Sequence, residues 1–140
     1  MSQAQPAAFR LDRFILRESH IVFREGGEFE LEVHIDPKGY VFPDLNQFQL
    51  ELTVSVKDQE DKLDVKVIAV GIFEFEAEMN LEELKQSYFT ANAPAIMFPY
   101  IRAYLATLTA QSGLITINLP TYNLSGMAEV LAERITVEEQ

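Results

Sequence analysis

Two histidines, His20 and His34, are the side chains of this sequence best suited to acid–base chemistry. A catalytic base needs a positioned partner, and each histidine stands inside an alternating strand pattern without one. The adjacent acids lie in a turn, at a helix start and in the tail, where solvation and the helix dipole account for them (Glu60–Asp61, Glu82–Glu83 and Glu138–Glu139). The sequence therefore predicts no catalytic residue and no enzyme.

The sequence contains no recognisable motif for a metal ion or a nucleotide. The chain has no cysteine, and its histidines and carboxylates do not have the spacing of metal ligands. Its six glycines never form the phosphate-binding patterns GxGxxG or GxxxxGKS/T. We therefore expect no metal, no cofactor and no ATP-driven step.

The net charge limits the partners of this chain. Eleven basic and 22 acidic residues give a formal charge of −11, which repels nucleic acid and anionic membrane surfaces. The absence of cysteine suits a reducing compartment, and the first residues do not resemble a secretory signal. The apolar stretch 93–117 is interrupted by Arg102 and two prolines, so we expect no membrane-spanning helix. These features predict a cytoplasmic protein.

The elements that would position any site begin with four strands. Apolar residues alternate with polar ones in 28–36 and 48–56, and an apolar run fills 63–77, which predicts that its centre is covered on both sides. Another strand is expected within 9–23. Between the second and third strands, 37–46 contains Pro, Gly and Pro and is expected to be an irregular connection.

Helices follow the strands. A short helix is expected after Asn80, and a long one opens at Asn92 or Pro94 and stops before Gly113, with a kink or late start at Pro99. The segment 114–120 should be extended, and a last helix, capped by Asn123 or Ser125, should run to about Ile135. Four strands followed by helices predict an α+β fold in one domain, 1–140, with 1–8 and 136–140 as flexible tails.

One region of the sequence is almost without charge. Between Gln86 and Ala128 the only charged residue is Arg102. The outer face of a helix in a small monomer normally carries Lys, Glu and Arg, whereas the long helix here has Ala, Thr, Tyr and Gln. This composition favours burial between subunits or exposure as a binding surface over a private core.

The order of motifs in this region resembles the SecB family of protein-export chaperones. The resemblance rests on Gly71-Ile72-Phe73, on Asn92-Ala93-Pro94 with Met97-Phe98-Pro99-Tyr100 and Arg102, and on Asn118-Leu119-Pro120 with Asn123. It covers about 48–131. It implies a four-stranded antiparallel sheet packed with a long and a shorter helix, and a dimer of dimers with the long helices sandwiched between sheets.

The resemblance also implies a function. Family members hold unfolded or precursor proteins in apolar grooves without ATP and pass them to the SecA motor ATPase. Here the client-binding residues would be apolar side chains of the 37–46 connection and of the charge-free region (Tyr40, Val41, Phe42, Leu45, Met97, Phe98, Tyr104, Leu119, Tyr122 and Leu124). The oligomer interface would be formed by the long helix (Tyr100, Ile101, Arg102, Leu105 and Leu108), where Arg102 is expected to meet an acid across the subunit contact.

The sequence departs from the family pattern at several positions. Leu124 follows Asn123 where the family has an aromatic residue, and Thr121-Tyr122 replaces Pro-Val. Positions where the family displays acids for SecA correspond to His20, Arg24 and Lys66. Chaperoning is thus better supported than delivery to SecA.

Two alternatives stay open. The first is a SecB-like chaperone dedicated to another client, such as the antitoxin of a toxin–antitoxin system. The second is a small-ligand-binding protein, for which Arg102 with Tyr100, Tyr104 and Tyr122 is the only polar cluster to nominate.

Overall fold

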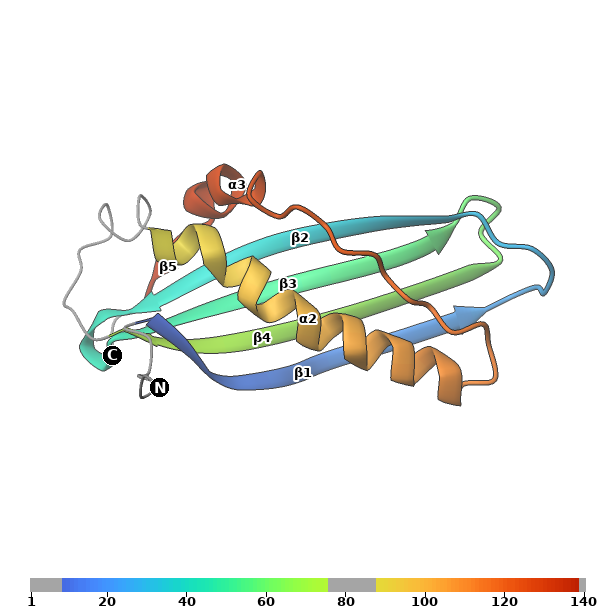
Figure 1. Cartoon of the computed structure of the whole chain (residues 1–140), viewed down its shortest axis with the longest axis horizontal. Helices are drawn as coiled ribbons and strands as arrows, with labels where there is room; N and C mark the ends of the chain where they lie inside the picture. The colour runs from blue at the N-terminus through green and yellow to red at the C-terminus, as the bar shows by residue number, and fades with distance from the viewer. Residues whose placement is uncertain (1–8, 76–87, 139–140) are drawn as a thin grey trace, which may run out of the picture.

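A twisted sheet with helices on one face makes up the fold (Figure 1). The computed structural model describes residues 9–75 and 88–138. The strands are β1 (Phe9–Phe23), β2 (Leu31–Phe42), β3 (Gln47–Asp58), β4 (Leu63–Phe75) and β5 (Ile135–Val137), and the helices are η1 (Pro43–Leu45), α2 (Tyr88–Gln111) and α3 (Met127–Glu133). The predicted α+β class is confirmed. The expected short helix after Asn80 lies outside the described residues.

The sheet has the strand order β1-β4-β3-β2-β5. The first four strands pair antiparallel, and β5 pairs parallel with β2 over Gly39–Val41. The prediction of a four-stranded antiparallel sheet is therefore wrong at one edge, and the sheet is mixed. The predicted tail is partly wrong too, because 136–137 belong to β5.

The segment 37–46, expected as an irregular connection, is mostly strand. Strand β2 continues through Pro37 and Gly39 to Phe42, and the three-residue helix η1 makes the turn into β3. Proline removes a ladder hydrogen bond only where its nitrogen would face a neighbouring strand, and here Pro37 faces the outer edge of β2. Position 39 needs glycine because an added Cβ would lie 2.9 Å from the ring of Phe48.

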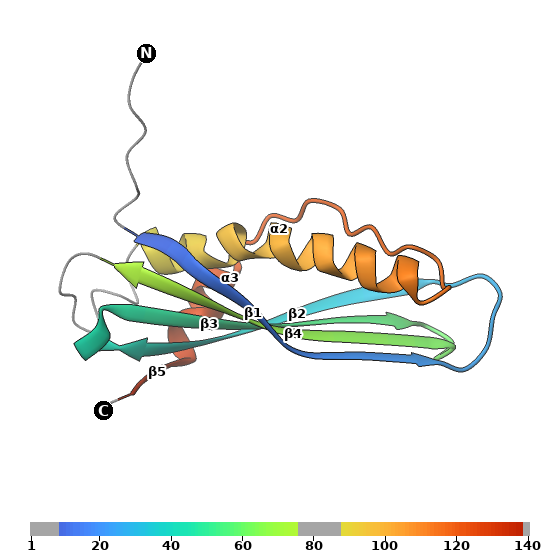
Figure 2. The same ribbon diagram turned by 90° about the horizontal axis from the view of Figure 1, so that it is seen from below.

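Helix α2 lies across one face of the sheet, and the core fills the space between them (Figure 2). Alternate residues of β3 and β4 point toward this helix and are fully buried (Phe48, Leu50, Leu52, Val54, Val56, Leu63, Val65, Val67 and Phe73). The helix contributes Ala93, Met97, Ile101 and Leu105, which repeat every four residues. Met97 approaches Gly71 so closely that a Cβ there would lie 2.9 Å from the methionine sulfur.

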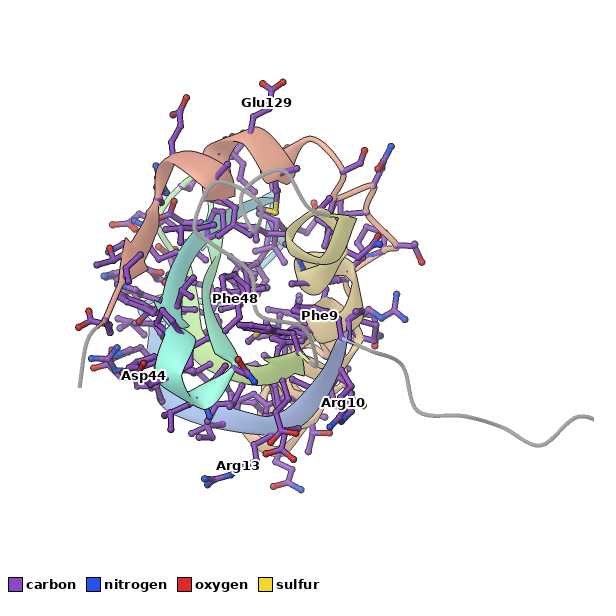
Figure 3. The ribbon with its side chains drawn as sticks, turned by 90° about the vertical axis from the view of Figure 1, so that its left-hand side faces the viewer. Phe9, Arg10, Arg13, Asp44, Phe48 and Glu129 are labelled. Atoms are coloured by element: carbon purple, nitrogen blue, oxygen red, sulfur yellow. The ribbon has the colours of Figure 1, made fainter. Side chains whose placement is uncertain are left out.

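The end-on view in Figure 3 shows the two sides of this core. Phe9 and Phe48 point into the space between sheet and helix, where Phe9 stacks on Phe73 with ring centroids 4.9 Å apart. Arg13 and Glu129 point outward. Helix α2 runs through both Pro94 and Pro99, so the expected late start at Pro99 is wrong. Within the described residues, no helix is both long and apolar enough to cross a membrane.

The far face of the sheet carries no helix in the described part of the chain (Figure 2). Ile68, Val70 and Ile72 are half-buried there, so the predicted cover on both sides of β4 is not found among these residues. Charged neighbours pair across the strands instead, through Arg10–Glu74, Arg17–Glu51 and Lys57–Asp64. This face therefore carries ion pairs beside the half-buried apolar residues of β4.

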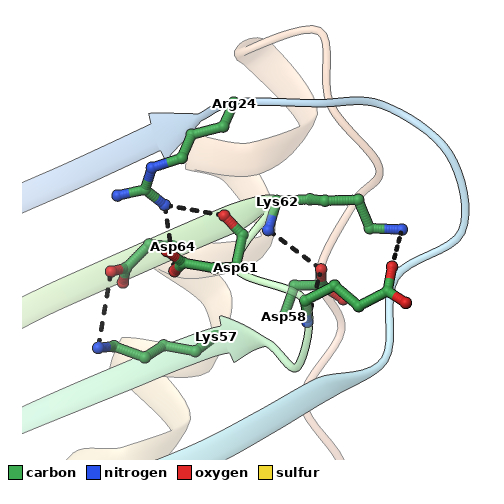
Figure 4. Close-up of polar contacts among 7 residues, drawn as sticks. Arg24, Lys57, Asp58, Asp61, Lys62 and Asp64 are labelled. Carbon is green, nitrogen blue, oxygen red and sulfur yellow. Dashed lines mark hydrogen bonds and ion pairs between the residues drawn. The ribbon is translucent and has the colours of Figure 1, made fainter.

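One end of the sheet is closed by polar contacts around Asp58 (Figure 4). The Asp58 carboxylate accepts hydrogen bonds from the backbone N–H groups of Glu30, Glu60 and Lys62. Burial alone would raise the pKa of Asp58, but these N–H donors and the Lys62 charge outweigh it and hold the pKa below its ordinary value. The carboxylate thus fixes the β3–β4 turn to the chain entering β2.

Candidate functional site

An apolar groove lies on the helix side of the sheet, beside strand β2. Its volume is about 370 Å³. Strands β2 and β3 form one side and the segment after α2 forms the other (Leu31, Val33, Val56, Ile115, Thr116, Ile117, Asn118, Leu119, Pro120 and Tyr122). None of these residues is charged. The described lining can therefore accept apolar side chains, and it contains no acid, amine or imidazole.

The segment 114–124 crosses over the sheet between α2 and α3 (Figure 1), and its residues 115–120 and Tyr122 form one wall of the groove. Ile117 and Leu119 are buried, whereas Ile115 is 49% exposed and open to a ligand. Tyr122 meets the edge of the buried Phe98 ring, with centroids 5.7 Å apart. Buried residues of the segment thus anchor the wall to the core, while exposed residues such as Ile115 can contact a ligand.

Two polar contacts tie this wall to α2. The Thr109 hydroxyl donates to the carbonyl of Leu105 at 2.9 Å and accepts from the N–H of Ile117 at 2.9 Å. The Arg102 guanidinium donates to the Thr121 hydroxyl at 3.2 Å. Sequence reasoning expected Arg102 to meet an acid of another subunit, whereas within this chain its partner is a neutral hydroxyl.

Replacing Thr109 by valine tests the anchor. The substitution keeps the shape but leaves the buried N–H of Ile117 without an acceptor, so we expect the free energy of unfolding to fall by about 1–3 kcal/mol. Urea denaturation measures the loss. Thr107→Val is the matched control, since among the described residues its hydroxyl bonds only to the Ala103 carbonyl, on the exposed side of α2. Equal losses in the two variants would show that Thr109 is no anchor.

The ten residues predicted to bind clients do not all meet in the groove. Leu119 and Tyr122 line it, and Leu124 is buried just beyond it. Met97 and Phe98 lie in the core, and Tyr104 is hydrogen-bonded to Ser19 of β1 at 2.7 Å. The structure thus brings two of these six residues to the groove surface.

The other four predicted client-binding residues, all from 40–45, point in different directions. Val41 is buried on the helix side, whereas Tyr40 and Phe42 lie on the far face and Leu45 is 50% exposed in η1. They were grouped because 37–46 was expected to be one loop. In a strand, successive side chains alternate between faces, which separates them.

The sequence does not identify the β2–β3 side of the groove or most of its opposite wall. Its patterns place Leu31, Val33 and Val56 on the inward faces of strands and Ile115 and Ile117 in an extended, uncharged segment, without indicating that they meet. The available signal was the alternation of Ile115, Ile117 and Leu119, which has the period of a strand and predicts that every second side chain is buried. In the described structure this segment pairs with no strand, so its other side chains are left to line the groove.

The exposed side of α2 forms a second uncharged surface, here called the α2 ridge (Ile96, Pro99, Tyr100, Ala103, Thr107 and Ala110). Of the predicted interface residues, Tyr100 is 52% exposed, and Arg102 and Leu108 are half-buried. Ile101 and Leu105 are fully buried against their own sheet, so they support α2 from beneath.

The cluster nominated for a small ligand is divided between two sides of α2. Tyr100 and Tyr104 contact Phe14 and Ser19 of β1. Arg102 and Tyr122 belong instead to the anchoring of 114–124. The four side chains therefore do not converge on one pocket.

The two histidines lie on the far face of the sheet. Both are exposed, each within 4.0 Å of one glutamate of its own strand. His20 stands directly opposite Lys66 in the β1–β4 register, and Arg24 pairs with Asp61 at the end of the sheet. None of His20, Arg24 and Lys66, the positions where the SecB family displays acids for SecA, is therefore acidic, although Glu18 and Asp61 lie nearby.

Known proteins resemble this chain in sequence and in fold. A family model described as the preprotein translocase subunit SecB matches residues 17–130. An uncharacterized protein of Methanocaldococcus jannaschii is 25% identical over 95% of this chain and 90% of its own length. The protein-export protein SecB of Anaplasma phagocytophilum is 26% identical over 59% of this chain and 54% of its own length.

A solved structure supports the fold. It is the Mycobacterium tuberculosis SecB-like chaperone in complex with a peptide from the HigA1 antitoxin, with a TM-score of 0.70 and 16% identity. The match covers 82% of this chain and 88% of the other.

Proposed function

This chain belongs to the SecB family, and we propose that it is an ATP-independent chaperone that holds unfolded or precursor proteins in its apolar groove. The observation that carries the proposal is the uncharged groove of about 370 Å³ in a chain of formal charge −11. Aliphatic and aromatic walls bind many apolar sequences because they make few directional contacts.

Holding a client requires more than one groove. Micromolar affinity corresponds to about −8 kcal/mol, and ordering an unfolded segment opposes binding. A single groove of this size holds a few side chains. A client that occupies several linked grooves gains from a high effective concentration.

We therefore also propose that the chain assembles as a homotetramer, a dimer of dimers, through the α2 ridge. Supporting this, Ile96 and Tyr100 are 38% and 52% exposed, and the small residues Ala103 and Ala110 allow another helix or sheet to approach closely. Charged residues, which are normal on an exposed helix face, are missing from the ridge.

The destination of the client is a separate proposal. Export would require handing the client to the SecA motor, and the basic or neutral character of His20, Arg24 and Lys66 argues against an acidic docking face at those positions. A client such as an antitoxin is the second candidate. It is favoured by the likeness to a chaperone that was solved with an antitoxin peptide.

Light scattering measures the mass of the purified protein, alone and mixed with a permanently unfolded chain, in the absence of nucleotide. This measurement tests both proposals. We expect a mass near four chains that rises when reduced, carboxymethylated α-lactalbumin is added. Folded lactalbumin is the control and should leave the mass unchanged. A monomer that ignores the unfolded chain would overturn both the tetramer and the chaperone assignment.

A further inference from the structure

The C-terminal strand β5 is held on the edge of β2 by few contacts. The N–H of Gly39 donates to the carbonyl of Arg134 at 3.2 Å, and the N–H of Glu138 donates to the carbonyl of Val41 at 2.8 Å. Ile135 is 9% exposed, and Arg134 pairs with Asp36 in an exposed ion pair. One buried side chain and a three-residue ladder therefore keep β5 in place.

The same edge of β2 is open beyond β5. In a strand, every second residue directs both backbone groups to the same side, and Gly39 and Val41 face β5. Leu31, Val33 and Ile35 lie an even number of residues before Gly39, so their backbone N–H and C=O groups also point away from β3. These backbone groups have no partner among the described residues. An unpaired edge of this kind accepts an added strand.

This open edge adjoins the groove. The side chains of Leu31 and Val33 line the groove, so the residues that present free backbone groups also present its apolar floor. A polypeptide added along this edge would place alternate side chains on the groove side. An extended segment with apolar residues at every second position fits both features.

We propose that β5 is a displaceable strand that competes with an extended client segment for the edge of β2. The inference rests on the proposed chaperone function and concerns its regulation by the chain's own C-terminus. A client bound only at 31–35 gains a short ladder. A client that also removes β5 can continue its ladder to the backbone groups of Gly39 and Val41.

Acidic substitutions on the two faces of β5 test the inference. Ile135→Asp places a charge at the buried contact and should release β5, whereas Thr136→Asp adds the same charge at an exposed position. We expect Ile135→Asp to bind reduced, carboxymethylated α-lactalbumin about tenfold more tightly than the wild-type chain, as measured by fluorescence anisotropy. Thr136→Asp should bind like the wild type.

A reversible disulfide gives a second test that does not depend on the fold tolerating Ile135→Asp. Tyr40 and Thr136 are parallel register partners, and the chain has no other cysteine to interfere with the pair Tyr40→Cys/Thr136→Cys. The oxidised form should bind the unfolded chain at least tenfold more weakly than the same protein reduced with dithiothreitol.

The outcomes separate the two proposals. If the wild-type chain binds the client but oxidation and Ile135→Asp leave the affinity unchanged, β5 is structural and the competition is wrong. If Ile135→Asp folds and binds more weakly, β5 is part of the site and the competition is also wrong. If the wild type binds no unfolded chain, the chaperone function itself fails, and this inference fails with it.

Discussion

Replacing Val33 and Ile115 together by serine is expected to raise the dissociation constant for an unfolded chain ten- to a hundredfold. The two side chains lie on opposite sides of the groove, and both retain exposed surface that a client would cover. Fully burying such a side chain contributes about 1.5–3 kcal/mol. Ile115 is 49% exposed and Val33 keeps a smaller exposed part, and a bound client buries its own apolar surface against both. The pair should therefore lose about 1.5–3 kcal/mol, which corresponds to this change in affinity.

The matched control for the groove is Val22→Ser. Val22 is 42% exposed on the far face of β1, away from the groove, so its replacement removes comparable apolar surface. Anisotropy titrations with labelled, carboxymethylated α-lactalbumin measure all three proteins, and circular dichroism verifies their folding. Phe98 is a poorer test because it is 4% exposed beneath Tyr122, and its loss would also destabilise the fold.

Equal binding by the groove variant and the wild type would place the client elsewhere. The far face would then be the next surface to test, since the apolar residues Ile68, Val70 and Ile72 are only half-buried there.

Introducing two glutamates on the α2 ridge, as Ile96→Glu/Ala103→Glu, is expected to dissociate the proposed tetramer. The positions are seven residues apart on one helix face, so the new charges do not oppose each other within the helix. In an apolar subunit contact each charge would be buried without a partner at a cost of several kcal/mol. A contact between two chains would contain the new charges of both, and their summed cost exceeds the roughly 8 kcal/mol of a micromolar interface. Light scattering should show the mass falling from four chains to two or one.

A charge-matched control addresses the other face of the sheet. His20→Glu/His34→Glu adds the same two acids at exposed positions of the far face. We expect this variant to remain a tetramer. If it dissociates while the ridge variant stays assembled, the far face is the subunit contact and the ridge assignment is wrong.

The sequence by itself determined the four long strands and pointed to the uncharged region that supplies the wall of the proposed site. Alternating residues such as Leu50, Leu52 and Val54 can be buried in only one way, because a strand directs every second side chain to the same face. The near absence of charge from 86 to 128, where Arg102 is the only charged residue, likewise pointed to α2 and the segment after it, and the motifs around Arg102 identified the family.

The sequence did not reveal the edge of the sheet. Strand β5 has three residues, too few to show a period, and it pairs with a strand almost a hundred residues earlier in the chain. Pro37 and Gly39 indicated a loop because these residues break structure locally. They are compatible with a strand only because Pro37 faces an outer edge and Gly39 meets Phe48 closely, and both reasons depend on neighbours distant in sequence.

The groove was decided by tertiary structure alone. Its lining comes from β2, β3 and the segment 114–124, which are adjacent only because the chain crosses back over the sheet after α2. Local patterns establish that Val33 is half-buried and that Ile115 is extended. Their meeting across one groove depends on the length of α2 and on the anchors at Thr109 and Arg102, and these are properties of the whole fold.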